Sequence, residues 1–576
     1  MKDTDESQVV EDVSRRRFMT KTAATGSIIA GGGTLLGATA AQAAPQKTTT
    51  TQALKKRALE AFEKRKWAAS AYLSNFNPKP PKNNGDEKKY RDLRGAFFKT
   101  LPQNEFGEVD RSAYRELRRA LRKGSFEAME QVPLSPVNER ALANPLASVA
   151  FDVMGPDSWS LRMPPAPAFN SDAIAAEMGE VYWQAITRDI PFSEYGTDPL
   201  IAQAAADMDN FTVKMGTGDP ITPANLFRGE TPGDLVGPYI SQFLWAPTSW
   251  GLADLSQQFK MPLAGQGFGA TEADWLAIQR GAVPAGPAIF DASARHIATG
   301  RDLAEYVHGD VLYQAYLTAA LILLGYGADA IDPNNPYLAS NTQGAFATFG
   351  GAEVVDMVAK VGRSALLAAW FQKWQVHRRL RPETFAGRAH FQSTGQRSYD
   401  INQELFDSDA VSYLLLNNGN LFLPLAYPEG SPTHPAYPAG HATVAGACGT
   451  ILKAYFNEDY EIPAPVEASA DGLTLNPWTG DALTVGGEID KLAANISIGR
   501  DTAGVHYRSD GIDGLFLGEQ VALGILQDYA NTRAAGFGGF ELTLFDGSEV
   551  TVGGDGVKRR RPRKYRNRKD RWGDFY

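Results

Sequence analysis

Cysteine is almost absent from this chain of 576 residues, because Cys448 is the only one. An intramolecular disulfide is therefore excluded, and the fold must rest on a buried core, which a chain of this length can form. Cys448 lies among the small residues of Ala445–Gly449, which predicts a buried, inert thiol. The apolar (43%) and charged (21%) fractions exclude a collagen-like or wholly disordered chain.

Outside the C-terminal segment a net positive charge is missing, because acidic residues outnumber basic ones there. The formal net charge is −9, but residues 558–576 hold ten Lys and Arg against Asp570 and Asp574, so the preceding chain carries about −17. An acidic body argues against nucleic-acid binding, because phosphate contacts need a basic face. We interpret residues 558–576 as a solvated basic tail.

Long apolar runs are also missing, since no stretch has eighteen uninterrupted apolar residues, and no membrane span is predicted. The N-terminal segment has another pattern: Arg15-Arg16 begins a twin-arginine motif, a glycine-rich apolar stretch follows, and Ala41-Gln42-Ala43 fits a cleavage site. We therefore predict that residues 1–43 are a twin-arginine export signal. The mature protein is expected to be periplasmic or extracellular.

Alternating strand patterns are scarce, whereas helical periodicity is common, so the predicted fold class is all-α. Long helices are predicted over residues 53–73, 302–324 and 353–380. Ser112 is expected to cap a shorter helix that stops at Gly124, and Ser171-Asp172 is expected to open another. The clearest strand signal predicts a minor β-hairpin within residues 536–557, with its turn at Asp546-Gly547.

The first of three polar segments runs from Lys373 to Pro382. On one helix Lys373, His377 and Arg381 recur every four residues and form a stripe of positive charge. Pro382 prevents an unbroken helix, which places Arg381 at its C-terminal end. A stripe of this kind is usually solvated, but residues 365–371 are apolar on every side, and buried cations need an anion.

The second segment runs from His434 to His441. Its Pro438-Ala439-Gly440-His441 turn leads into a helix of small residues, whose free backbone N–H groups can bind an oxyanion. A histidine in the first turn can exchange a proton with the bound group. Taken singly, the segment is also typical of a plain junction between a loop and a helix.

The third segment runs from Gly499 to Asp510. Arg500 offers two parallel donors to an oxyanion. Asp510 follows His506 by one helical turn, where its carboxylate can hold one ring N–H and leave the other nitrogen free as a ligand or nucleophile. A His/Asp pair at this spacing is also a common surface contact.

Together the segments predict a cage for a tetrahedral, multiply charged oxyanion, built from three cations, a helix N-terminus and histidines. Four of the seven histidines fall within them, namely His377, His434, His441 and His506. We interpret the other three, which are His296, His308 and His390, as packing or surface residues.

The spacing Lys-x7-Arg-Pro, Pro-x-Gly-His and Arg-x5-His-x3-Asp resembles the signature shared by vanadium haloperoxidases and type 2 phosphatidic-acid phosphatases. The stretches "KWQVHRRLRPE", "SPTHPAYPAGHA" and "GVHYRSDG" are most similar to bromoperoxidases of red algae and cyanobacteria, and the likeness covers roughly residues 170–530. It implies two packed four-helix bundles within residues 44–535, the motif-bearing one at about 350–530. A homodimer or larger homo-oligomer is also implied.

The resemblance further implies a vanadate cofactor, held at positions that match the family's motifs. His506 would be the axial ligand to vanadium, with Asp510, His377 and Trp374 behind the binding groups. Neutralising contacts to the equatorial oxygens would come from Lys373, Arg381, Arg500 and the backbone N–H of Gly440.

The resemblance also implies catalytic roles for three residues. His441 would hydrogen-bond the apical hydroxide and act as acid and base, Lys373 would polarise the peroxide, and His434 occupies a position where bromoperoxidases also carry histidine. Ala439 departs from the family, which usually has serine there. One hydroxyl donor to the bound vanadate is therefore missing.

The implied activity is oxidation of bromide or iodide by hydrogen peroxide to hypohalous acid, which halogenates small organic nucleophiles. The same cage leaves open a secreted acid phosphatase, in which His506 attacks phosphorus and His441 protonates the leaving alcohol. A non-catalytic oxyanion-binding protein is a third alternative. Neither the natural organic substrate nor a structural calcium can be derived from the sequence.

Overall fold

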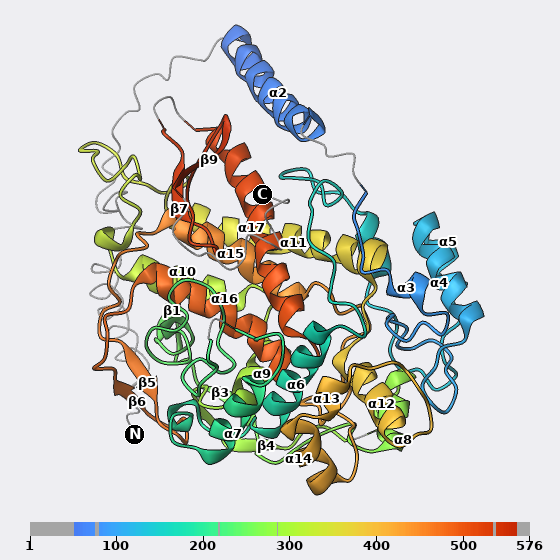
Figure 1. Cartoon of the computed structure of the whole chain (residues 1–576). Helices are drawn as coiled ribbons and strands as arrows, with labels where there is room; N and C mark the ends of the chain where they lie inside the picture. The colour runs from blue at the N-terminus through green and yellow to red at the C-terminus, as the bar shows by residue number, and fades with distance from the viewer. Residues whose placement is uncertain (1–50, 75–79, 217–218, 285, 534–536, 562–576) are drawn as a thin grey trace, which may run out of the picture.

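The computed structural model describes residues 51–74, 80–216, 219–284, 286–533 and 537–561. The predicted export signal over residues 1–43 and the basic tail beyond Arg561 lie outside the described residues. Within the described ranges the chain is mainly helical, with small antiparallel sheets at its surface (Figure 1). The all-α prediction with minor β structure is confirmed.

Four long helices form the bundle that carries the three polar segments. They are α11 (Gly351–Phe371), α15 (Gly440–Tyr455), α16 (Val485–Thr502) and α17 (Arg508–Ala530). Helix α15 contacts the other three, and all its residues except His441 are buried. Glycines permit this close packing: a Cβ atom on Gly518 would lie 1.9 Å from the Thr443 carbonyl oxygen.

A second group of helices packs beside this bundle. Its members are α6 (Asp172–Ile186), α7 (Pro199–Met208), α12 (Pro382–Ser393), α13 (Gln403–Phe406) and α14 (Asp409–Asn418). Helix α6 begins where predicted, because the Ser171 hydroxyl accepts the Ile174 N–H. Since α6 also contacts α16, the two groups share one hydrophobic core.

The apolar segment predicted as one helix over residues 302–324 is two helices, α9 (Gly300–Gly309) and α10 (Gln314–Gly325). They are bent by 98°, because Asp310 has extended backbone and turns the chain away from the axis of α9. No single helix in the described part of the chain is long and apolar enough to cross a membrane, although this bent pair together meets the criteria of length and composition.

The helix predicted over residues 353–380 also ends early. Helix α11 stops at Phe371, a π-helical turn η5 covers Gln372–His377, and Arg378 adopts a left-handed conformation with φ 42°. Pro382 then begins α12, with Arg381 at its N-cap. The prediction that Lys373, His377 and Arg381 share one helical stripe was wrong, because the π-helical turn and the left-handed Arg378 end the helix before Arg381.

The N-terminal part contributes α2 (Thr51–Ser74), α3 (Asp86–Lys89), α4 (Arg111–Lys123) and α5 (Phe126–Met129). Helix α4 ends at Gly124 as predicted, but its N-cap is Asp110, whose carboxylate accepts the Ser112 N–H at 2.7 Å. The prediction that Ser112 is the cap was therefore wrong by two residues.

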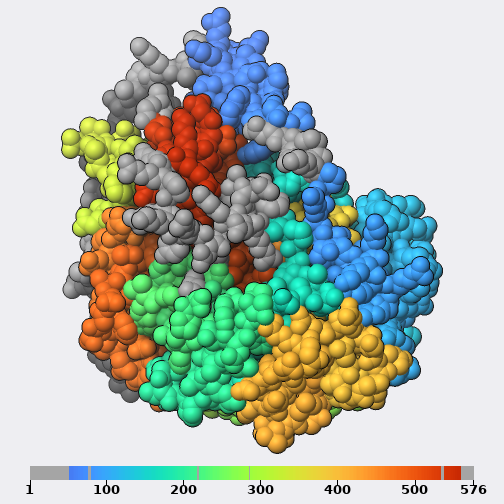
Figure 2. All heavy atoms as spheres, viewed as in Figure 1, coloured from blue at the N-terminus to red at the C-terminus, as the bar shows by residue number. Residues whose placement is uncertain are grey.

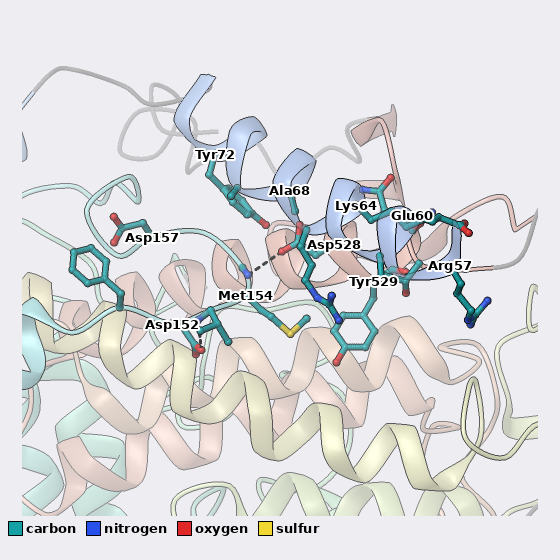
Figure 3. Close-up of a pocket in the computed structure, with 18 residues that line it drawn as sticks. Arg57, Glu60, Lys64, Ala68, Tyr72, Asp152, Met154, Asp157, Asp528 and Tyr529 are labelled. Carbon is teal, nitrogen blue, oxygen red and sulfur yellow. Dashed lines mark hydrogen bonds between the residues drawn. The ribbon is translucent and has the colours of Figure 1, made fainter. Parts of the chain in front are cut away.

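Helix α2 lies at one end of the molecule, where its Tyr72 hydroxyl donates to the Gly524 carbonyl of α17 (Figures 1 and 2). Its predicted extent over residues 53–73 is confirmed, but none of its residues is buried. A cavity of about 780 Å³ lies between α2 and the C-terminal part of α17, with Tyr72 and Asp528 on its walls (Figure 3). None of the lining residues belongs to the three polar segments.

The predicted hairpin near the C-terminus is confirmed as β7 (Phe540–Thr543) and β8 (Glu549–Gly553), in which Phe540 pairs with Val552. A third strand, β9 (Gly556–Arg561), pairs with β8 and includes the first residues that the sequence assigned to the basic tail. The other strands are β1 (Thr248–Trp250), β2 (Ala253–Leu255), β3 (Phe259–Pro262), β4 (Phe290–Arg295), β5 (Val466–Ala468) and β6 (Leu475–Pro477).

The remaining helical elements are short. They are α8 (Glu272–Gln279) and the 3₁₀ turns η1 (Pro145–Val149), η2 (Phe192–Glu194), η3 (Gln242–Leu244) and η4 (Ala328–Ala330).

Candidate functional site

Two cations of the first segment meet at the loop that precedes α15. The Lys373 ammonium donates to the carbonyls of Pro435 at 2.7 Å and Ala436 at 2.8 Å. The Nε of Arg381 donates to the His434 carbonyl at 3.0 Å. Both side chains are fully buried. Lys373 and Arg381 thus belong to different helical elements, but both side chains bind the backbone of the same loop.

The third cation, Arg500, lies near the end of α16. Its guanidinium donates to the Val307 carbonyl at 2.6 Å and to the Tyr427 hydroxyl at 3.3 Å. The hydrogen-bond acceptors of Lys373, Arg381 and Arg500 are carbonyls, a hydroxyl and imidazole nitrogens, and no carboxylate in the described part of the chain pairs with them.

This arrangement is electrostatically costly without an anion. Burial, together with repulsion from Arg381 and Arg500, holds the pKa of Lys373 well below its ordinary value. Burial chiefly, with Arg500 adding repulsion, lowers the pKa of Arg381 to about 9. A multiply charged oxyanion between these groups would neutralise them and accept their free donors.

His506 directs one ring nitrogen toward the cations. Its Nδ1 lies 2.9 Å from Oδ2 of Asp510, so the predicted pair is present, and its Nε2 lies 2.9 Å from a terminal nitrogen of Arg381. Because the carboxylate needs a donor, Nδ1 carries the hydrogen and Nε2 carries the lone pair. Burial and the cations Arg381, Lys373 and Arg500 hold the pKa of His506 far below 6.5, so the ring is neutral.

The N-terminus of α15 joins the second and third segments. Ala439 is its N-cap, with φ −69° and ψ 127°, and makes no side-chain cap. The Ala439 N–H donates to the Asp510 carbonyl at 2.8 Å. The first-turn N–H groups, which begin with Gly440, have no acceptor within the helix and carry partial positive charge.

His441 follows in the same turn and has a partner that sequence reasoning missed. Its Nε2 lies 3.1 Å from Oδ1 of Asp310, directly after α9. Partial burial and repulsion from Arg500 lower the pKa of His441 from its ordinary value of 6.5, so its ring is uncharged above that pH. The structure shows no hydrogen bond to Nδ1 from any described residue, which leaves this nitrogen available to exchange a proton.

The three remaining predicted residues, His434, His377 and Trp374, have different surroundings. Nδ1 of His434 lies 3.0 Å from Arg381, and its ring packs on Trp370 with centroids 4.8 Å apart. His377 is buried, forms no hydrogen bond with a described residue at either ring nitrogen, and packs edge-on against Tyr437. Trp374 packs on Phe97 in a separate hydrophobic cluster. Thus His434 joins the three cations, whereas Trp374 belongs to the core beyond them.

His308, interpreted as a surface or packing residue, lies closer to the site than expected. Its ring stacks on Tyr427 with centroids 3.8 Å apart, and Tyr427 contacts Arg500. Although burial lowers the pKa of His308, hydrogen bonds to Glu305 and Glu429 raise it to about 9. His296 and His390 instead bond to backbone groups of other segments, Gln257 and Leu421.

The chemistry of these donors fits vanadate. Within the described ranges no group of three or more His, Cys, Asp or Glu residues could hold a metal cation. The site instead offers one neutral imidazole, three buried cations and a helix N-terminus, which suit a metal that arrives as an oxyanion.

Known proteins share the sequence and the shape of this chain. A family model described as the VCPO second helical-bundle domain matches residues 355–533, which contain all three polar segments. A vanadium-dependent bromoperoxidase of Ascophyllum nodosum is 36% identical over 526 residues, covering 86% of this chain and 93% of that protein. A vanadium-dependent bromoperoxidase of Corallina pilulifera is 34% identical over 595 residues, covering 87% and 99%.

A solved structure of such a protein also has a fold similar to that of this chain. The homohexameric second vanadate-dependent bromoperoxidase from Ascophyllum nodosum superposes with a TM-score of 0.84 at 29% sequence identity. The superposition covers 92% of this chain and 96% of that one.

Proposed function

This chain belongs to the vanadium-dependent haloperoxidase family, given its 33–36% identity to relatives along almost their whole length, and we propose that it binds vanadate and oxidises bromide and iodide with hydrogen peroxide. The observation that carries the proposal is the set of three buried cations whose charges act on His506, none paired with a described carboxylate, and of which Arg381 contacts Nε2 of that ring.

The residues that would hold vanadate come from all three segments. His506 would offer to vanadium the Nε2 lone pair that faces Arg381 in this structure, and Asp510 holds the opposite side of the ring. The charged oxygens would be neutralised by Lys373, Arg381 and Arg500, with the Gly440 N–H at the start of α15. When bound, vanadate supplies a Lewis-acid centre at which peroxide becomes an oxidant for halide.

The side chains around this centre have different roles in the proposed reaction. His441 is neutral and bonded to Asp310 through Nε2, so it can take a proton at Nδ1 and return it. The Lys373 ammonium, fixed by two carbonyls, withdraws electron density from an oxygen near it. His434, held between Arg381 and Trp370, provides a polar wall close to the reacting atoms.

Activity assays distinguish the peroxidase from the alternatives. Purified protein loaded with vanadate is expected to consume peroxide and brominate an organic dye only when bromide is present. A His506→Ala variant, tested in parallel, is expected to lose this activity. Hydrolysis of a phosphate ester without bromide-dependent peroxide consumption would instead support the phosphatase, and the absence of both activities would support an oxyanion-binding protein.

We also propose that the chain assembles as a homo-oligomer, which the homohexameric relative supports. Light scattering coupled to size-exclusion chromatography measures the molar mass directly. A mass of one chain, 62.4 kDa or less, at micromolar concentration would contradict this proposal.

Export through the twin-arginine pathway remains part of the proposal, supported by the sequence pattern at Arg15-Arg16. Changing both residues to lysine is expected to leave folded precursor inside the cell. Unchanged export, or a mature N-terminus far from Ala44, would show that these residues are not the signal.

A further inference from the structure

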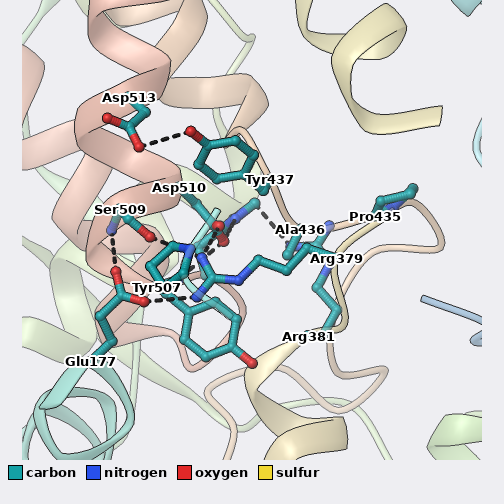
Figure 4. A network of polar contacts seen from close by, with 12 residues as sticks. Glu177, Arg379, Arg381, Pro435, Ala436, Tyr437, Tyr507, Ser509, Asp510 and Asp513 are labelled. Carbon is teal, nitrogen blue, oxygen red and sulfur yellow. Dashed lines mark hydrogen bonds and ion pairs between the residues drawn. The ribbon is translucent and has the colours of Figure 1, made fainter. Parts of the chain in front are cut away.

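The carboxylate of Asp510 uses its two oxygens for different partners (Figure 4). Oδ2 accepts the Nδ1–H of His506 at 2.9 Å and the backbone N–H of Tyr507 at 3.2 Å. Oδ1 accepts a terminal N–H of Arg379 at 2.7 Å. The orientation of the His506 ring therefore depends on a carboxylate whose far oxygen is held by arginine.

Arg379 itself is held on several sides. Its second terminal nitrogen donates to Glu177 at 2.7 Å, and the first also donates to the Ser509 hydroxyl at 2.9 Å. The guanidinium lies 4.0 Å from the centroid of the Tyr507 ring, a cation–π contact. With 2% of its surface exposed, Arg379 has little freedom to move.

Glu177 comes from α6, far from the three polar segments along the chain. One of its carboxylate oxygens accepts from Arg379, and the other accepts the Ser509 N–H at 2.7 Å (Figure 4). It thereby satisfies a first-turn donor of α17, where a negative charge is favourable. The chain Glu177–Arg379–Asp510 ties α6 to the residue that supports His506.

We propose that Arg379, anchored by Glu177, is a positioning residue for vanadate: it fixes the Asp510 carboxylate so that Nε2 of His506 points at the vanadium atom. The inference rests on the proposed function. Two terminal nitrogens serve two carboxylates, a geometry that the single nitrogen of lysine cannot reproduce.

Vanadate and orthophosphate distinguish positioning from general support of the fold. Both tetrahedral oxyanions would contact the cations Lys373, Arg381 and Arg500, but only vanadate would gain a bond to His506. Misorientation of the His506 ring should therefore lower the affinity for vanadate more than the affinity for orthophosphate. A general loss of structure around the three cations should lower both affinities equally.

The experiment titrates vanadium-free protein with vanadate and, separately, with orthophosphate in a calorimeter at fixed pH. For Arg379→Met we expect the ratio of vanadate to phosphate affinity to fall about tenfold or more, as is common when a group behind a metal ligand is removed. Glu177→Gln keeps the shape of the side chain but loses one charge, and should lower the ratio less. Arg379→Lys, which restores one donor, should recover part of it.

Arg378 provides a matched control on the adjacent residue. Its guanidinium is also buried and donates to both carboxylate oxygens of Glu87, at 2.5 Å and 3.1 Å, but not to Asp510. Arg378→Met therefore removes a comparable buried ion pair. We expect it to lower stability while it leaves the affinity ratio within about twofold of wild type.

Equal loss of both affinities in Arg379→Met, or an unchanged ratio, would overturn the positioning role. If Arg379→Met does not fold, the same criterion applies to Glu177→Gln and Arg379→Lys. The wild-type protein separates the two proposals. If it binds no vanadate, the proposed function fails as well, whereas wild-type binding with unchanged ratios in the variants overturns only the role of Arg379.

Discussion

Replacing Ala439 with serine restores the hydroxyl that members of the family usually carry at this position. Ala439 is the fully buried N-cap of α15, and its N–H is already used by the Asp510 carbonyl. A hydroxyl here can therefore add contacts without replacing this backbone hydrogen bond. It can donate to a charged oxygen of the anion and accept an N–H of the first helical turn.

The two contacts affect different measured quantities, which are the vanadate affinity and the free energy of unfolding. A hydrogen bond to a charged group contributes about 1.5–3 kcal/mol, which corresponds to about tenfold or more in vanadate affinity. An N-cap contact contributes about 1 kcal/mol to the free energy of unfolding, whether or not vanadate is bound. Activity does not depend on the hydroxyl, since three cations and the helix N-terminus already stabilise the anion.

The assay titrates vanadium-free Ala439→Ser and wild type with vanadate at fixed pH in phosphate-free buffer, and follows urea unfolding of both. Ala445→Ser, which adds a hydroxyl to a buried position further along α15, is the control and should not tighten vanadate binding. If Ala439→Ser becomes more stable but binds vanadate no better, the side chain caps the helix and does not face the anion. In that case the hydroxyl that Ala439 lacks is not a donor to vanadate.

Other perturbations test individual side chains. His506→Ala should remain folded but lose bound vanadium, measured by metal analysis after gel filtration; stoichiometric vanadium would show that the ligand is another residue. His441→Ala should retain part of the vanadium but lose most bromide turnover, and a wild-type rate would exclude its proton-transfer role. Chloride turnover at neutral pH should fall far below bromide turnover, because chloride is harder to oxidise; equal rates of peroxide consumption would contradict this. The pKa of His308 is raised from 6.5 to about 9, so its contribution to stability is complete below pH 6.5 and is lost as the pH rises through 9. Urea unfolding at pH 6.5 and pH 9.5 should therefore show a smaller pH dependence for His308→Gln than for wild type, and an identical dependence would contradict the shift.

Local signals allowed much of the fold to be predicted. Helical periodicity and the Ser171 cap placed α6, and the Asp546-Gly547 turn placed the hairpin, because each depends on residues close in sequence. The break between α9 and α10 was missed, since apolar residues continue on both sides of Asp310. Strand β9 was missed because its basic residues are typical of a solvated tail.

In the candidate site, too, contacts between residues close in sequence could be predicted and those between distant residues could not. The pair His506 and Asp510 follows from one helical turn, and the structure confirms it. The partners Asp310 and Glu177 could not be predicted, since each lies more than a hundred residues from the group it contacts. Arg379 lies within the first segment, but its contact with Asp510 arises only because the π-helical turn redirects the chain.

The central claim is that His506 and the three buried cations hold vanadate for halide oxidation. Its most direct test is a single titration of vanadium-free protein, in which bound vanadium and bromide-dependent peroxide consumption are measured at each step. We expect both quantities to rise together and to saturate at one vanadium per chain. Saturation of vanadium without bromide oxidation, or bromide oxidation in protein that holds no vanadium, would contradict the account.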